Sequence, residues 1–145
     1  MLLRRAFLGA STAWLALIPL AAFAASRPAA PSSIYALAAG VYAVGHFVCH
    51  QLPARSFHLW GVQLPVCARC TGVYVGAAAT AIALTLGRRR VQTDRARLVF
   101  VLAVLPTAAT LVFEWTTGVT PSNWIRAIAG LPLGAAVAWA IGMVN

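Results

Sequence analysis

Charged side chains are scarce in this sequence, and those of negative sign are almost absent. The 145 residues contain no lysine, Asp94 and Glu114 are the only acids, and 9% of the chain is charged while 61% is hydrophobic. A domain of this size leaves much of its surface in contact with solvent, so it cannot hide this many apolar side chains in one core. The composition therefore excludes a soluble globular domain and indicates that lipid is the solvent for most of the surface.

The near-absence of acidic residues leaves a formal charge of +9, which comes entirely from arginine. In a soluble protein such a balance would suggest nucleic acid as a partner. Here the arginines lie mainly in short segments between apolar runs, which is typical of anchoring at anionic headgroups and of setting membrane topology. We therefore expect the lipid bilayer, and not nucleic acid, to be the partner.

Five apolar segments divide the chain. The first follows Arg4 and Arg5 and ends in small residues, a pattern of either a signal peptide or a first transmembrane helix; we expect a retained helix because four apolar segments follow. Those four cover residues 34–50, 67–86, 98–115 and 124–144. The sequence predicts an all-α integral membrane protein with about five transmembrane helices in one small bundle, multi-pass in the plasma membrane. Residues 1–25 would form the N-terminal helix, and residues 34–145 a four-helix domain.

Small residues recur within two of these segments. Gly72 and Gly76 have GxxxG spacing, and so do Gly130 and Gly134. This spacing permits close contact between transmembrane helices. We therefore expect tight helix packing at both positions.

All three cysteines and all three histidines lie between His46 and Gly76. Within this stretch, residues 52–66 carry two prolines and a glycine among aromatic residues, which predicts a packed loop. Cys67 and Cys70 follow with CxxC spacing, which places two sulfurs on one turn, where they can hold a metal ion or close a disulfide. Chemistry, if the chain performs any, is expected here.

A metal site is the first interpretation of these cysteines. Cys49 and His50, at the end of the preceding span, would complete a Cys₃His tetrahedron around Zn²⁺, or a softer site for copper. His46, one helical turn earlier, is an alternative ligand or a residue that supports the ligands. The predicted metal ligands are Cys49, His50, Cys67 and Cys70.

Counting the spans brings further polar residues to the same membrane face. The third span starts at the cysteine loop, so the fourth returns to that side and ends near Glu114, and the fifth starts there. Ionisable groups at membrane depth indicate a functional site by default, although Glu114 could simply pair with Arg126 or Arg69. The candidate catalytic residues are Glu114, Arg55, Arg69 and Arg126. The candidates for substrate binding or for support of the ligands are His46, Gln51, Arg55, Ser56, Arg69, Glu114, Asn123 and Arg126.

The arginines indicate what the site would bind and where it lies. Guanidinium groups bind carboxylates and phosphates through paired N–H donors, so an anionic lipid or a phosphate-bearing substrate is expected. With five spans, the N-terminus shares the face of the cysteine site. The numbers of arginines on the two faces are then nearly equal. If Arg55, Arg69 and Arg126 are occupied inside the site, the 88–97 connection is expected to be cytoplasmic and the cysteine site external, whereas Arg4 and Arg5 favour the reverse.

Other functions stay open. The CxxC pair near a helix start, beside Arg69, is also typical of a thiol–disulfide oxidoreductase, with Cys49 as a resolving thiol and a quinone as electron acceptor. That scheme gives no role to the other polar residues, and three cysteines do not make two pairs. A transporter would need polar residues at mid-depth, which the first and fifth spans almost lack. In a purely structural protein the cysteines would serve as small packing residues.

The string CHQLPARSFHLWGVQLPVCARCTGVYVG resembles the signature of a bacterial and archaeal membrane family known as domain of unknown function 2085. The matching residues are Cys49, His50, Gln51, Arg55, Ser56, Phe57, Gly61, Pro65, Cys67, Arg69, Cys70, Gly72, Tyr74 and Gly76. A second block of the family is similar to Glu114, Ser122, Asn123, Arg126 and Gly130, with aspartate usual at the position of the glutamate. The resemblance runs from about Ile34 onward. It implies a small helical membrane protein with a polar cysteine site, and it implies no reaction.

Overall fold

The protein is built mainly of helices. A computed structural model describes residues 2–86 and 96–143. The elements are α1 (Leu2–Ala25), α2 (Ser32–Val48), a 3₁₀ turn (Pro53–Arg55), β1 (Ser56–Leu59), β2 (Val62–Cys67), α3 (Ala68–Leu86), α4 (Ala96–Thr117) and α5 (Asn123–Met143). Within these ranges, α1, α3, α4 and α5 are long and apolar enough to cross a bilayer. The all-α membrane class is confirmed.

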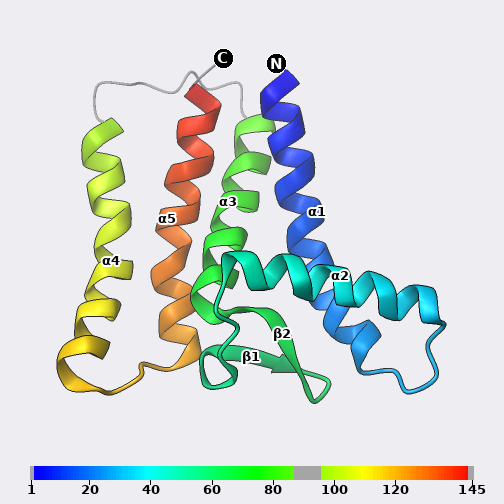
Figure 1. The fold of residues 1–145 in the computed structure, drawn as a ribbon. Helices are drawn as coiled ribbons and strands as arrows, with labels where there is room; N and C mark the ends of the chain where they lie inside the picture. Colours follow the sequence, from blue (N-terminus) through cyan, green and yellow to red (C-terminus); the bar gives the residue numbers. More distant parts are fainter. Residues whose placement is uncertain (1, 87–95, 144–145) are drawn as a thin grey trace.

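The second helix, α2, differs from the second transmembrane span that the sequence predicted. Its 17 residues span about 25 Å, less than the roughly 30 Å of hydrocarbon in a bilayer. In Figure 1, α2 runs crosswise to the long axes of the other helices and passes over α1, near the end of the bundle that carries the two strands. The sequence predicted one bundle of the four spans after residue 34; in the structure α1 contacts α3, and α2 contacts α1 and β2.

The orientation of α2 also corrects the predicted position of the N-terminal arginines. The first turn of α1 and the last turn of α5 lie at the end of the bundle opposite the strands (Figure 1). A five-span topology would have placed the first turn of α1 on the cysteine face. Because α2 lies across the bundle instead, Arg4 and Arg5 belong to a helix turn at the other end.

Glycine residues determine how closely α3 and α5 approach each other. A Cβ atom on Gly72 would lie 1.9 Å from the carbonyl oxygen of Ala127, and one on Gly134 would lie 1.8 Å from that of Val73. Gly76 and Gly130 meet the facing backbone in the same way. The two predicted GxxxG motifs thus pack against each other, and this contact aligns the starts of the two helices.

The segment predicted as a loop between α2 and α3 contains an antiparallel hairpin. Trp60 and Gly61 connect β1 to β2, and both have positive φ, 52° and 76°. This combination is typical of the tight type I′ turn, whose twist suits a two-residue hairpin. The register places Ser56 opposite Cys67, after a bulge. The hairpin therefore holds Ser56 beside Cys67, the residue directly before α3.

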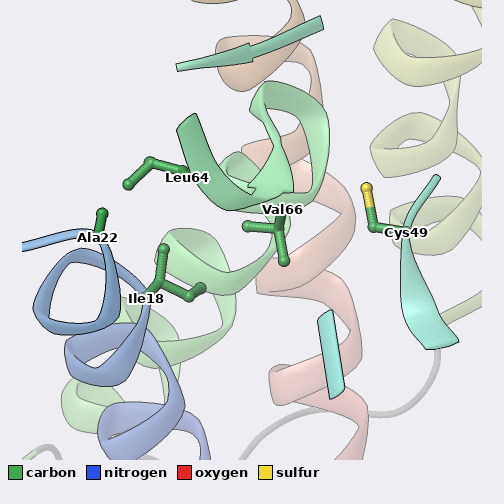
Figure 2. Packing of buried hydrophobic residues seen from close by; sticks show 5 residues of the cluster. All are labelled: Ile18, Ala22, Cys49, Leu64 and Val66. Atoms are coloured by element: carbon green, nitrogen blue, oxygen red, sulfur yellow. The ribbon is translucent and has the colours of Figure 1, made fainter. Parts of the chain in front are cut away.

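A small apolar cluster connects this hairpin to the bundle. Ile18 and Ala22 of α1 pack with Leu64 and Val66 of β2, and Cys49 belongs to the same cluster. In Figure 2, Val66 lies between Cys49 and the two α1 residues. The segment at Cys49 and the end of β2 at Val66 are thus held by the same apolar cluster.

Candidate metal and anion site

The three cysteine side chains come together at the end of the bundle that the hairpin covers. The Sγ atoms of Cys49, Cys67 and Cys70 all lie within 4.8 Å of one another. Three thiolates around one tetrahedral Zn²⁺ lie about 3.8 Å apart, because each Zn–S bond is about 2.3 Å long. A shift of about 1 Å would therefore bring the three sulfurs onto one ion.

Each cysteine comes from a different element. Cys49 follows α2 in an extended conformation, Cys67 is the last residue of β2, and Cys70 lies in the first turn of α3. The backbone N–H of Cys67 donates a hydrogen bond to Sγ of Cys49, with an N···S distance of 3.1 Å. This hydrogen bond ties the sulfur of Cys49 to the backbone at the end of β2. All three cysteines are free.

Gln51 attaches the end of α2 to β2. Its backbone has a positive φ of 48°, and its Nε2 donates hydrogen bonds to the carbonyl oxygens of Tyr42 (2.8 Å) and Pro65 (2.7 Å). Gly45 permits this approach, because a Cβ there would lie 2.2 Å from the Pro65 oxygen. Gln51 thus positions the backbone that carries the first two cysteines.

The thiol of Cys67 has an environment that favours its ionised form. A hydrogen bond from the Cys70 thiol lowers the pKa of Cys67 well below the ordinary cysteine value, although burial acts in the opposite direction. The thiolate is the form of cysteine that binds metal ions and attacks disulfides. Cys67 is therefore prepared for either kind of chemistry.

Glu114 lies at the centre of an arginine cluster beside the sulfurs. Its carboxylate accepts hydrogen bonds from Arg126 and from Nη2 of Arg69, the latter at 3.2 Å. Nη2 of Arg55 lies 3.7 Å from the same carboxylate. The predicted pairing of Glu114 with Arg126 or Arg69 is thus found with both. Because three guanidinium groups share one carboxylate, the cluster keeps an excess of positive charge.

Part of the hydrogen-bonding capacity of this cluster is unused. Among the described residues, the buried Nε atoms of Arg69 and Arg126 have no acceptor, and Arg126 as a whole is only 2% exposed. Nδ2 of Asn123 donates to the carbonyl oxygen of Ser56 at 3.0 Å, but its buried Oδ1 has no partner in the same ranges. A buried polar group without a partner typically costs about 1–3 kcal/mol, and a charged one more. The two guanidinium N–H donors are therefore suited to a ligand that accepts hydrogen bonds, whereas the amide oxygen of Asn123 is suited to a donor.

One pocket of about 390 Å³ connects the sulfurs with the arginines. Its polar wall contains the three cysteines, the three arginines of the cluster, His50 and Gln51. Its apolar wall contains Val48, Leu52, Leu111 and Trp115. A ligand in this pocket would contact cysteine sulfurs, guanidinium groups and hydrocarbon at once.

The predicted histidines lie outside the sulfur group. His50 is exposed and lines the pocket, but it is not among the metal-ligating side chains that converge within the described residues. His46 is exposed on α2. Ser56 is buried, and its hydroxyl donates to the carbonyl oxygen of Leu52 at 3.0 Å, so its role is to hold the hairpin.

Two features of the site were missed in the sequence. Oγ1 of Thr110 accepts a hydrogen bond from Nη2 of Arg69 at 3.1 Å, and Leu111 and Trp115 form half of the apolar wall. Thr110 lies four residues before Glu114, so helical spacing could have placed both on one face. Leu111 and Trp115 gave no such signal, because apolar residues on a transmembrane helix are the rule.

Comparison of the sequence with models of known families gives a match over most of the chain. Residues 49–140 match a family described as predicted membrane protein (DUF2085), and this range contains every cysteine and arginine of the site. An uncharacterised protein of Methanocaldococcus jannaschii is 53% identical over 36 residues, which are 25% of this chain and 23% of that protein. An uncharacterised protein of Methanothermobacter thermautotrophicus is 33% identical over 92 residues, which are 63% of this chain and 82% of that protein. No solved structure matches.

Proposed function

We propose, for a chain that belongs to the DUF2085 family of predicted membrane proteins, that Cys49, Cys67 and Cys70 bind one Zn²⁺ ion and that the adjoining arginine pocket binds an oxyanion. The main support is the convergence of three sulfurs from three separate elements within 4.8 Å of one another. Structural zinc sites use four protein ligands, whereas sites with three keep one position open for water or substrate. A three-sulfur site beside a pocket therefore favours binding of an exogenous ligand over a purely structural role.

The charges of the site support the oxyanion. Three thiolates and one Zn²⁺ together carry a single negative charge, and Glu114 adds a second. Arg55, Arg69 and Arg126 carry three positive charges around them. Buried charges are costly unless they are paired, so an anion in the pocket would complete the balance. Phosphate and carboxylate oxygens also suit the paired N–H donors of guanidinium groups.

Metal analysis of the detergent-purified protein tests the zinc proposal. We expect about one zinc per chain in the wild type and almost none in Cys67→Ser or Cys70→Ser, because each variant removes one of three sulfur ligands. His50→Ala is the matched control within the pocket, and it should keep its zinc. Loss of zinc in His50→Ala would contradict an open fourth position, and copper in place of zinc would contradict the metal assignment.

A thiol–disulfide oxidoreductase is the second candidate, and the lowered pKa of Cys67 favours it. In that scheme the thiols of Cys67 and Cys70 form a disulfide, and their two electrons and two protons reduce a quinone to the quinol. Counting free thiols on the same samples, with and without reductant, separates the two functions. The zinc proposal predicts three thiols once the metal is removed under denaturing conditions. Absence of metal with fewer than three thiols would support the redox function instead.

A further inference from the structure

The apolar wall of the pocket has two sides that belong to different parts of the chain. Leu111 and Trp115 lie one helical turn apart on α4. Val48 and Leu52 face the pocket from the end of α2 and the segment that follows it. Three of these residues are exposed, Trp115 to 79%, Val48 to 55% and Leu52 to 46%. The pocket is therefore bordered by hydrocarbon that is accessible from outside the protein.

These residues lie at the depth where a bilayer changes from hydrocarbon to headgroups. Leu111 is six residues before the end of α4 at Thr117, which corresponds to about 9 Å along a helix. Trp60 and Trp124 are exposed at the same end of the molecule, and tryptophan is enriched at membrane–water interfaces. The arginine cluster is thus close to the level of lipid phosphates.

We propose that the oxyanion of the site is the phosphate of a membrane lipid, which enters sideways between the end of α2 and α4. This proposal rests on the oxyanion site of the preceding section. The phosphate would contact the guanidinium groups of Arg55, Arg69 and Arg126, and the lipid chain would lie along Leu111 and Trp115. A water-soluble phosphate would leave the apolar wall without a partner, whereas a lipid chain can lie along this wall while its phosphate reaches the arginines.

The test is direct lipid binding to the detergent-purified full chain, measured by native mass spectrometry. The probes are dihexanoyl phosphatidic acid, phosphatidylcholine of the same chain length and glycerol 3-phosphate. We expect phosphatidic acid to bind at least about tenfold more tightly than either of the others, a difference of about 1.4 kcal/mol. Leu111→Ser should reduce the preference over glycerol 3-phosphate by at least about tenfold. Leu98→Ser, at an exposed position near the start of α4, is the matched control and should keep the preference.

The outcomes separate this inference from the function on which it rests. Equal binding of phosphatidic acid and glycerol 3-phosphate would overturn the lipid proposal and leave the oxyanion site intact. Equal binding of phosphatidylcholine would overturn recognition of the anionic phosphate. Failure of both phosphate probes to bind a protein that contains its zinc would overturn the oxyanion site itself. An equal loss in Leu98→Ser would also overturn the lipid proposal, since the effect would not depend on the pocket.

Discussion

Glu114 is the residue on which the charge balance of the site depends. Its carboxylate is 5% exposed and it contacts three guanidinium groups, of which Arg126 is 2% exposed and Arg55 43%. A buried charge whose partner is removed costs far more than an exposed one, because water cannot replace the lost partner. The three arginines therefore differ in how strongly they depend on this carboxylate.

Replacing Glu114 by glutamine should lower the free energy of unfolding by about 3–5 kcal/mol, because the buried guanidinium group of Arg126 and the half-buried one of Arg69 lose their counter-charge. Arg55→Gln is the matched control, and it should cost no more than about 1 kcal/mol because its side chain is partly solvated. Both values are measurable by denaturant titration in detergent. A cost below about 1 kcal/mol for Glu114→Gln would show that the cluster does not depend on this carboxylate.

Individual residues of the candidate site were only partly predictable from the sequence. The CxxC spacing and the Cys49–His50 pair pointed to the three cysteines whose sulfurs lie within 4.8 Å of one another. The sequence could not show that the chain turns directly after Cys49. Cys49 has an extended conformation and Gln51 a positive φ. With this backbone, the sulfur of Cys49 lies beside the other two sulfurs while the imidazole of His50 stays exposed.

At the level of helices and strands, the close contact between α3 and α5 holds the first turns of the two helices side by side. These turns carry Cys70 and Arg126. Glycine was informative here, since GxxxG spacing has a direct physical meaning in membranes. The hairpin was less predictable, because Pro53, Gly61 and Pro65 all suggest a loop. Its tight turn requires a positive φ at Trp60, a conformation that a tryptophan rarely signals.

Gly134→Ala should separate α3 from α5 and lower the free energy of unfolding by about 1–3 kcal/mol or more, because the new Cβ would lie 1.8 Å from the Val73 carbonyl oxygen. Gly40→Ala is the matched control on α2, where a Cβ meets nothing within 4 Å. It should be neutral or stabilising by up to about 1 kcal/mol. Equal stability of the two variants in the same denaturant titration would contradict the close contact.

For the whole molecule, the position of α2 changes the distribution of charge across the membrane. Seven of the eleven arginines belong to the first turn of α1, the 87–95 connection or the first turn of α4 (Arg4, Arg5, Arg88, Arg89, Arg90, Arg95 and Arg97). In Figure 1, the start of α1, the end of α3 and the start of α4 lie at the end of the bundle opposite the hairpin. Residues 87–95, which connect α3 to α4 in the sequence, lie outside the described residues. The sequence counts had been nearly equal for the two faces, because α2 was assumed to span. Its apolar composition did not reveal its orientation.

The positive-inside rule now predicts a cytoplasmic location for the 87–95 connection and an external one for the cysteine site. Single cysteines in a background with all three native cysteines replaced by serine can test this with a membrane-impermeant maleimide. In intact cells, Thr120→Cys, between α4 and α5, should be labelled and Thr93→Cys should not. Permeabilised cells should label both. The reverse pattern in intact cells would place the site in the cytoplasm.

The most direct test of the central claim is X-ray absorption at the zinc edge of the purified wild-type protein. A zinc ion held by the three cysteines, with an open fourth position, predicts three sulfur atoms at about 2.3 Å and one oxygen atom at about 2.0 Å. It also predicts that the spectrum lacks the outer-shell signal of a coordinated imidazole. An imidazole signal would make His50 or another histidine the fourth ligand and close the site. A shell without sulfur, or the absence of zinc, would contradict the account.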